Sequence, residues 1–169
     1  MIRPSKNAYQ DVPGWCSDEE AAALQYFSGG REVLEIGVWK GRSTMAMAAV
    51  AYSVFSIDHF IGDDFAGKSD PRQETIARFI PYQRVVTLCI GDWKNVVENL
   101  NIDKFDMTYY DADHSYKSTK EFFDVVHGYK GIIALHDVDN NPNHAGVKQA
   151  LEEVHGTNYT LYDRLAIIQ

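Results

Sequence analysis

Three short polar runs of the sequence carry side chains that can hold a cation or move a proton. They are residues 91–93 (Gly-Asp-Trp), 111–116 (Asp-Ala-Asp-His-Ser-Tyr) and 136–141 (His-Asp-Val-Asp-Asn-Asn), and each follows an apolar segment. Carboxylate oxygens suit Mg²⁺ and similar hard cations, and histidine is the side chain that titrates nearest neutral pH. The runs therefore indicate metal-assisted or acid–base chemistry.

Two aspartates are the main candidate metal ligands. Asp111 and Asp137 end apolar segments that we expect to be adjacent strands, so their carboxylates should hold a cation together, with water completing its shell. His136 is a third candidate ligand, and Asp113 and Asp139 are further ones. The alternative is structural, with Asp111 as a helix cap and His136 packed in the core.

His114 is the candidate general base. It lies three residues after Asp111, at the mouth of the same strand, and a neutral imidazole can accept the proton of an acceptor hydroxyl. A metal bound to that hydroxyl would also lower the hydroxyl's pKa. The alternative is that His114 only caps the helix that follows.

A strand-to-helix turn with two glycines precedes these runs. An apolar strand that contains Glu35 ends at Gly37, and three residues separate Gly37 from Gly41. Glycine lets the backbone turn sharply and approach a ligand closely, and Ser43 or Thr44 is placed to cap the next helix. The spacing Glu-x-Gly-x-x-x-Gly differs from the Gly-x-Gly-x-x-Gly of dinucleotide-binding folds. It indicates a ligand-binding turn or, as the alternative, an ordinary strand-to-helix turn.

The next expected strand also ends in an acid. Residues 53–57 lean apolar, and Asp58 follows them, 23 positions after Glu35. A carboxylate at this place can accept hydrogen bonds from ribose hydroxyls, and we expect the neighbouring His59 to line an adenine pocket. Because aspartate is common in turns, a helix or loop cap is the alternative. Combined with the glycine turn, Asp58 indicates a nucleoside ligand.

Strand-like and helix-like segments alternate along the chain. The expected strands are residues 33–36, 53–57, 85–90, 105–110, 131–135, 159–162 and 165–168. The expected helices are residues 17–27, 45–49, 71–80, 94–100, 116–127 and 145–154. We therefore predict an α/β fold: a Rossmann-like, doubly wound, mostly parallel sheet with a C-terminal antiparallel hairpin. Ligands bind beyond the carboxyl ends of such strands, so the polar runs should share one rim.

The glycine turn, Asp58 and the closing hairpin resemble the class I S-adenosylmethionine-dependent methyltransferases, over about residues 17–169. The resemblance implies that the turn lies against the methionine part of the cofactor. It also implies that Asp92 or its backbone meets the adenine ring, with Trp93 as cover; capping the helix 94–100 is the alternative for Asp92, and both roles can hold. The candidate cofactor-binding residues are Glu35, Gly37, Gly41, Ser43, Asp58, His59, Asp92, Trp93 and Asp111.

The spacing Asp111-x-x-His114, followed by His136-Asp137, resembles a metal-dependent branch of these enzymes. That branch includes sugar and catechol O-methyltransferases and cephalosporin-hydroxylase-like proteins. The resemblance implies metal ligands at Asp111 and Asp137 and a general base at His114. An acid or amide often stands beside the second aspartate, where this chain has His136 and Val138. A softer metal or weaker metal binding is therefore implied.

Composition limits the other possibilities. The chain has 169 residues, 45% of them hydrophobic, and we expect one domain, residues 1–169, with an irregular segment 1–16. The net charge of -8 and the lack of a Lys/Arg run argue against binding duplex nucleic acid. Only two cysteines, a polar amino end and no long apolar stretch predict a cytoplasmic protein without a membrane partner.

We therefore predict an enzyme that uses S-adenosyl-L-methionine, with Mg²⁺ or another divalent cation, to O-methylate a small hydroxylated molecule. A substrate lid would come from residues 59–70 or from a neighbouring subunit of a homo-oligomer. One alternative is a metal-dependent hydrolase or hydroxylase on the same fold, which would leave the glycine turn and Asp58 without a nucleoside. The other is a non-catalytic S-adenosylmethionine-binding domain, which the short amino end favours slightly.

Overall fold

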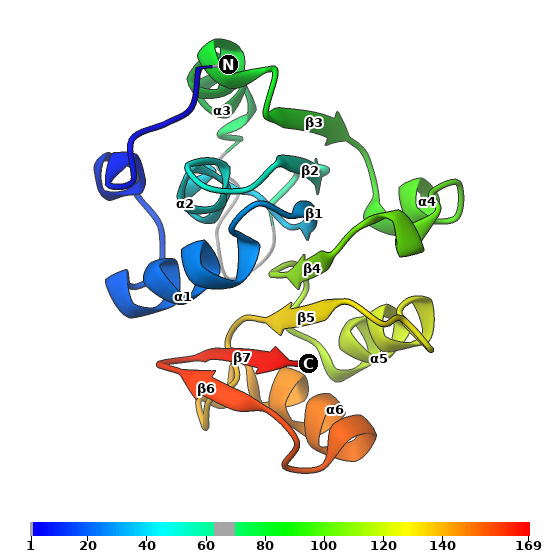
Figure 1. The fold of residues 1–169 in the computed structure, drawn as a ribbon. Helices are drawn as coiled ribbons and strands as arrows, with labels where there is room; N and C mark the ends of the chain where they lie inside the picture. Colours follow the sequence, from blue (N-terminus) through cyan, green and yellow to red (C-terminus); the bar gives the residue numbers. More distant parts are fainter. Residues whose placement is uncertain (1, 63–69) are drawn as a thin grey trace.

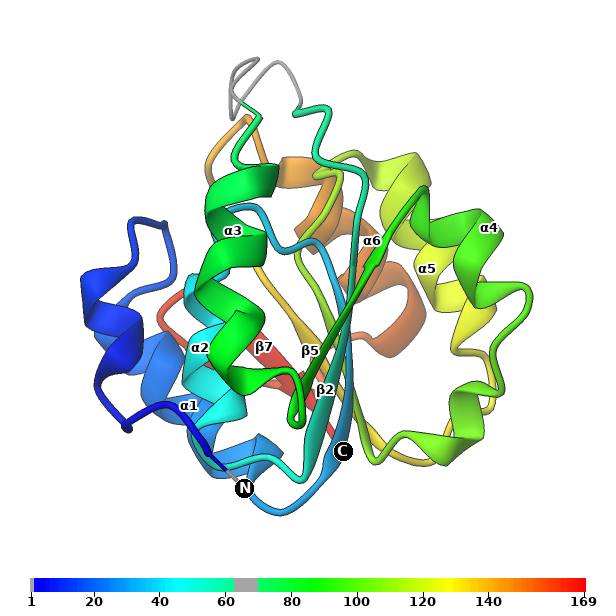
Figure 2. The same cartoon turned by 90° about the horizontal axis from the view of Figure 1, so that it is seen from above.

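A central sheet lies between two layers of helices (Figures 1 and 2). The computed structural model describes residues 2–62 and 70–169. One face of the sheet is covered by α1 (Asp18–Ser28), α2 (Arg42–Ala48) and α3 (Arg72–Phe79). The other face is covered by α4 (Trp93–Val97), α5 (Tyr116–Val125) and α6 (Ala145–His155).

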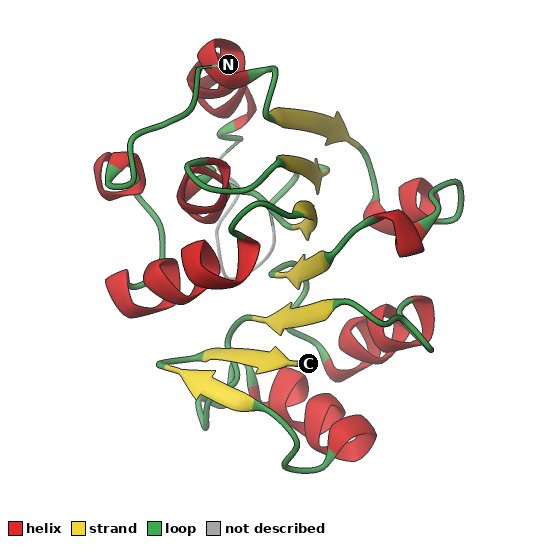
Figure 3. Cartoon of the chain, in the orientation of Figure 1, coloured by secondary structure: helices red, strands yellow, loops and turns green. Residues whose placement is uncertain are grey.

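The sheet has seven strands, shown in yellow in Figure 3. They are β1 (Glu32–Ile36), β2 (Ser53–Asp58), β3 (Val86–Ile90), β4 (Met107–Tyr110), β5 (Ile132–Leu135), β6 (Thr160–Tyr162) and β7 (Leu165–Ile168). Their order is β3-β2-β1-β4-β5-β7-β6. The first five pair in parallel, and β7 runs antiparallel to both β5 and β6. The predicted fold class, including the C-terminal hairpin, is confirmed.

The strands are apolar because both faces of the sheet are covered. Along β4, Met107 and Tyr109 belong to the core shared with α1 and α2, whereas Tyr110 belongs to the opposite core. The ring of Tyr110 stacks on Phe122 of α5, with 4.6 Å between the ring centroids. Successive side chains of one short strand therefore help to fix both helical layers.

The start of α1 is as the sequence predicts. Ser17 Oγ accepts the N–H of Glu20 at 3.3 Å, and the Glu20 carboxylate accepts the N–H of Ser17 at 2.6 Å, which completes a capping box. The predicted cap of α2 is wrong. Gly41 caps that helix with a φ of 83°, and the hydroxyls of Ser43 and Thr44 donate elsewhere, to Glu35.

Glu35, which is fully buried, stabilises the region beneath the glycine turn. Its carboxylate accepts hydrogen bonds from Ser43 Oγ and Thr44 Oγ1 of α2, each at 2.7 Å, and from Ser56 Oγ of β2 at 2.6 Å. These bonds tie β1 to the next strand and to the crossover helix between them. Burial raises the pKa of Glu35 to about 7, although the three hydroxyls favour the ionised form.

Other expected elements differ in detail. The segment 1–16 contains a short 3-10 helix, Ala8–Asp11, rather than being wholly irregular. Pro71 precedes α3 instead of opening it, and α4 is shorter than the expected helix 94–100. Most of the loop considered as a lid, residues 63–69, lies outside the described residues. No helix in the described part of the chain has the length and apolar character needed to cross a membrane.

We predict that Glu35→Gln makes the free energy of unfolding less dependent on pH. The folded state raises the pKa of Glu35 from 4.5 to about 7, so the contribution of this group to stability is complete below pH 4.5 and is lost as pH rises through 7. The unfolding free energy of Glu35→Gln relative to wild type should therefore increase by roughly 2–3 kcal/mol between pH 5 and 8.

Urea unfolding at several pH values measures this difference. The exposed residue Glu98 offers a matched control, because Glu98→Gln should follow the wild-type pH dependence. Parallel curves for wild type and Glu35→Gln would show that Glu35 has an ordinary pKa.

Candidate active site

A cavity of about 480 Å³ opens at the carboxyl ends of the parallel strands. Gly37 and Asp111, which follow the neighbouring strands β1 and β4, both line it. The strand order reverses between β1 and β4, and this is where open α/β sheets bind ligands. The volume falls within the roughly 300–1,000 Å³ typical of small-molecule sites.

Gly37 brings the end of β1 into direct contact with the end of β4. Its φ is 93°, and a Cβ atom there would lie 1.8 Å from the carbonyl oxygen of Asp111. Gly41 is constrained in a similar way, because its Cβ would lie 2.5 Å from Cζ of Phe79. Both positions therefore require glycine, because the backbone has a positive φ and there is little room for a side chain. Without a side chain at Gly37, the backbone of the turn can line the cavity directly.

Asp58 joins the ends of β1 and β2. Its Oδ2 accepts the backbone N–H groups of Val38 at 2.7 Å and Trp39 at 2.8 Å, and its Oδ1 accepts the N–H of Phe60 at 2.7 Å. A carboxylate has about four lone-pair sites, so three bonds leave acceptor capacity for a ligand hydroxyl. Asp58 thus shapes the glycine turn and also lines the cavity.

The predicted cofactor-binding residues divide into two groups. Glu35, Gly41 and Asp92 do not line the cavity; Asp92 is exposed and caps α4 by accepting the N–H of Lys94 at 3.0 Å. These residues support the walls without forming them. The residues that do line the cavity are Gly37, Ser43, Asp58, His59, Trp93 and Asp111.

The amino-terminal segment forms a further wall, which sequence reasoning missed. Gly14, Trp15 and Cys16 line the cavity. Arg42, the first residue of α2, holds this segment by donating to the carbonyl oxygens of Cys16 at 2.7 Å and Tyr9 at 3.0 Å. Each contact joins residues at least 26 positions apart, so local patterns carry no signal for it.

Aromatic rings make up much of this wall. Trp15 stacks on Trp39, with ring centroids 4.3 Å apart and an interplanar angle of 22°. Trp93 belongs to the core on the opposite face of the sheet, where its ring is edge-on to the ring of Tyr110. It also lines the cavity, so all three tryptophans of the chain do.

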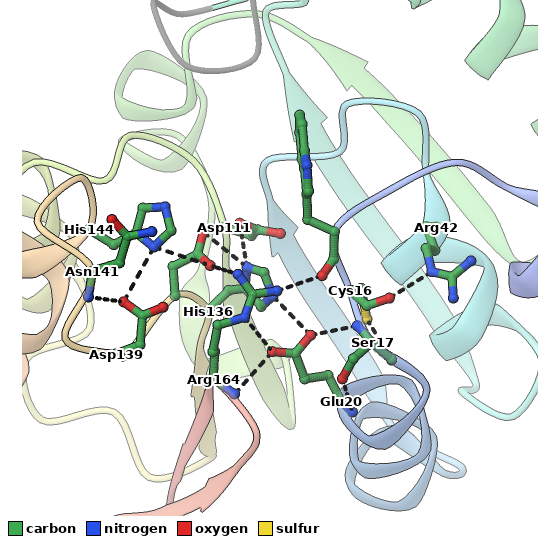
Figure 4. Close-up of polar contacts among 12 residues, drawn as sticks. Cys16, Ser17, Glu20, Arg42, Asp111, His136, Asp139, Asn141, His144 and Arg164 are labelled. Carbon is green, nitrogen blue, oxygen red and sulfur yellow. Dashed lines mark hydrogen bonds and ion pairs between the residues drawn. The ribbon is translucent and has the colours of Figure 1, made fainter.

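A buried charge cluster forms the floor of the cavity beside β4 and β5 (Figure 4). His136, 3% exposed, stands at its centre. Its Nδ1 lies 3.1 Å from Oδ1 of Asp111 and 3.3 Å from Oδ2 of Asp137, and its Nε2 lies 3.2 Å from Oε2 of Glu20. Tyr109 adds a hydroxyl that donates to Asp111 at 2.9 Å. The predicted meeting of Asp111, His136 and Asp137 is thus observed.

Asp137 is surrounded by positively charged side chains. Arg164 Nη1 donates to its Oδ1 at 2.7 Å, and His114 Nε2 lies 2.9 Å from its Oδ2. The residue has a φ of 57°, a conformation that costs energy for a residue with a side chain. Such strain concentrates at functional sites, where the surrounding contacts hold it.

The contacts within the cluster shift the pKa values of its two central aspartates and of His114 and His136 in the direction of the charged form. Burial opposes ionisation of Asp111, but His136 and His114 outweigh it and hold the pKa of Asp111 well below its usual range. Burial also opposes protonation of the histidines. Hydrogen bonds to Asp111 and Asp137 nevertheless raise the pKa of His114 to about 10. The negative charge of Asp111, together with hydrogen bonds to the surrounding carboxylates, raises the pKa of His136 well above its ordinary value. As long as the ionised carboxylates of Asp111 and Asp137 face it, His114 is therefore an imidazolium at neutral pH.

Three members of the site came from outside the predicted set. Glu20 belongs to the capping box of α1, yet it is fully buried and contacts His136. Arg164 lies in the turn between β6 and β7 and contacts Asp137. His144 is 2% exposed, and its Nδ1 lies 3.4 Å from Asp139 Oδ1 and 3.6 Å from Asp137 Oδ1.

Two of the weaker metal-ligand candidates have other partners. Asp113 accepts the N–H of Ser115 at 2.8 Å, and Asp139 accepts the N–H of Asn141 at 2.8 Å. Among the described residues, the group whose ligand atoms approach one another closely enough to share an ion is Asp111, His136 and Asp137.

Comparison with known proteins bears directly on this site. Residues 34–138, more than half of the chain, match the model of a family described as a methyltransferase domain. The chain belongs to this methyltransferase family. The match and the strand order confirm the predicted class I S-adenosylmethionine-dependent methyltransferase.

Solved structures share the fold of this methyltransferase at low sequence identity. An O-methyltransferase from Bacillus cereus in complex with SAH is 18% identical, with 96% of this chain and 87% of that chain covered and a TM-score of 0.63. The O-methyltransferase TomG from Streptomyces achromogenes, in complex with SAM, is 16% identical, with 96% and 84% covered and a TM-score of 0.62. The O-methyltransferase NovP is 17% identical, with 89% and 79% covered and a TM-score of 0.69. No curated protein sequence matches the chain.

We predict that Asp58→Ala weakens binding of S-adenosylhomocysteine to this methyltransferase by roughly 10- to 150-fold, since a hydrogen bond to a charged group contributes about 1.5–3 kcal/mol. The substitution removes the expected acceptor for the ribose hydroxyls and also frees the N–H groups of Val38 and Trp39. Calorimetric titration measures the affinity. Asp124→Ala is the control and should change it little, because Asp124 is exposed on α5 and lies outside the cavity. Unchanged affinity in Asp58→Ala would remove Asp58 from the binding site.

Proposed function

We propose that this methyltransferase O-methylates a small hydroxylated molecule bound beside His114, with the assistance of a divalent cation. The observation that carries the proposal is the convergence on one cavity of the glycine turn, Asp58 and the Asp111–His114 run. A nucleoside cofactor and an acid–base group would therefore share a single enclosed space. The O-methyltransferases of similar fold support oxygen as the methylated atom.

The cavity suits the cofactor chemically. Its lining extends over the ends of five successive parallel strands, which fits a long ligand with a nucleoside at one end and an amino acid at the other. Within the described residues, Nε1 of Trp39 is buried without a hydrogen-bond partner, so it is available to an acceptor atom of a ligand. When bound, S-adenosylmethionine supplies a methyl group on a sulfonium that is already a good leaving group. The protein's tasks are to align the acceptor and to remove its proton.

The Asp111, His136 and Asp137 side chains would hold the cation. Each offers one ligand atom, and these atoms lie within 4.8 Å of one another. Once cation binding displaces the proton from the His136 nitrogen, two carboxylate oxygens and one imidazole nitrogen would suit Mn²⁺ or Zn²⁺ at least as well as Mg²⁺. When bound, a cation there would favour the ionised form of an acceptor hydroxyl.

His114 is the proposed general base. Its pKa of about 10 depends on the charges of Asp111 and Asp137. If those carboxylates were shared with a cation, less negative charge would face the imidazole, and the pKa of His114 would be lower. The neutral imidazole then accepts the acceptor's proton, so the cation site and the base cooperate.

Release of S-adenosylhomocysteine from S-adenosylmethionine, measured with catechols, phenols and sugars, tests this function. Parallel reactions with Mn²⁺ and with a chelator separate metal-assisted from metal-independent transfer. Methyl transfer to an oxygen, faster with Mn²⁺, is the expected result. Tight cofactor binding without turnover on any acceptor would favour the non-catalytic alternative.

We predict that His114→Gln lowers turnover by about 10²–10⁴-fold, the usual contribution of a general base, and leaves cofactor affinity nearly unchanged. Wild-type turnover should rise with pH, because only the neutral imidazole accepts a proton. The measurement is the initial rate against pH under conditions where chemistry limits the rate. His127→Gln, at an exposed position outside the cavity, is the control. Wild-type turnover in His114→Gln would assign the base to another group, with His136 as the next candidate.

We also predict an anomalous scattering peak between Asp111 and Asp137 in crystals soaked in millimolar Mn²⁺ at neutral pH. The peak should weaken at acid pH, because the ligands must be deprotonated. Asp111→Asn is expected to abolish it. The lack of a peak in the wild-type protein at neutral pH would count against the cation part of the proposal.

A further inference from the structure

Arg164 occupies a fixed position beside the proposed cation ligands. It lies in the turn between β6 and β7, directly after Asp163, which has a φ of 55°. Its Nη1 donates to Asp137 Oδ1 at 2.7 Å, and its Nη2 donates to the carbonyl oxygen of Trp15 at 2.6 Å. The backbone N–H of Arg164 donates to Glu20 Oε1 at 3.1 Å. Three contacts with separate parts of the chain therefore hold its charge at the floor of the cavity (Figure 4).

This guanidinium already neutralises one oxygen of a proposed ligand. Asp137 Oδ1 is bonded to Arg164, and Asp137 Oδ2 faces His114 and His136. A divalent cation at Asp137 would meet the fixed positive charge of Arg164 within a few ångströms. Arginine keeps its charge at every pH at which a protein is folded, so loss of a proton cannot relieve that repulsion.

We infer that Arg164 competes with a divalent cation for Asp137 and thereby limits the cation affinity of the Asp111–His136–Asp137 site. The inference rests on the cation part of the proposed function. In this arrangement, cation binding requires Arg164 to release Asp137 Oδ1 or to share it. Asp137 then exchanges the guanidinium of Arg164 for the divalent cation as its counter-ion. A stronger contact between Arg164 and Asp137 therefore means a lower affinity for the cation.

Calorimetric titration with MnCl₂ tests the inference without an activity measurement. Wild type, Arg164→Gln, Arg164→Lys and Arg84→Gln are compared after chelator treatment, at one pH and one salt concentration. Arg164→Gln should bind Mn²⁺ at least about 10-fold more tightly, because one close like charge is removed. Arg164→Lys keeps that charge and should bind less tightly than Arg164→Gln. Arg84 is exposed and lies at the amino end of β3, away from the cavity, so Arg84→Gln controls for net charge.

The outcomes separate this inference from the proposed function. Mn²⁺ binding by Arg164→Gln but not by wild type would support the inference and contradict a cation in the native enzyme. Equal affinities for both would support a cation site and overturn the competition. An equal gain in Arg84→Gln would reduce the effect to net charge and overturn it as well. Lack of binding by either wild type or Arg164→Gln would overturn both proposals.

A measurement on the wild-type protein covers the case in which Arg164→Gln does not fold. The Nε–H signal of Arg164 in a ¹⁵N NMR spectrum is assigned by its loss in Arg164→Lys. Adding diamagnetic Zn²⁺ should shift this signal and speed its exchange with water, because the guanidinium gives up Asp137. A signal that does not change during the Zn²⁺ titration would overturn the inference.

Discussion

His136 is the residue on which the geometry of the site depends. Three carboxylates, those of Glu20, Asp111 and Asp137, lie within 3.3 Å of its ring nitrogens. Burying three negative charges together is unfavourable unless cations and hydrogen bonds compensate them. The imidazolium of His136 supplies a positive charge, and its two N–H groups, which point in opposite directions, supply hydrogen bonds to carboxylates on both sides. It therefore allows a carboxylate from α1 and two that follow β4 and β5 to meet below one cavity.

The same cluster joins the two ends of the chain. Glu20 belongs to the first α-helix, and Arg164 belongs to the last hairpin; the hydrogen bond between them spans 144 residues. Trp15 extends this connection, because its carbonyl oxygen accepts from Arg164 while its ring stacks on Trp39 of the glycine turn. The amino-terminal segment and the C-terminal hairpin are thus parts of the site as well as parts of the fold.

The glycine turn combines structural and binding roles. Glu35 ties the turn to α2 and β2, Gly37 lets it touch the end of β4, and Asp58 holds its N–H groups. These contacts lie within the protein and keep the turn rigid. A rigid turn at the reversal of strand order presents backbone and carboxylate to a ligand without a conformational cost on binding. Structural and functional explanations of these residues are therefore complementary.

The sequence by itself determined the parallel sheet, its closing hairpin and the rim on which polar side chains gather. These features follow from local periodicity and from turn residues, because a buried strand is apolar and its carboxyl end must return to polar surroundings. The closeness of Asp111 and Asp137 was also predictable, since each follows one of two strands that are adjacent in the predicted sheet. Only the tertiary structure decided the roles of Glu20, Arg164 and Trp15. Their contacts join distant segments whose spacing follows from packing, and local sequence patterns do not encode that packing.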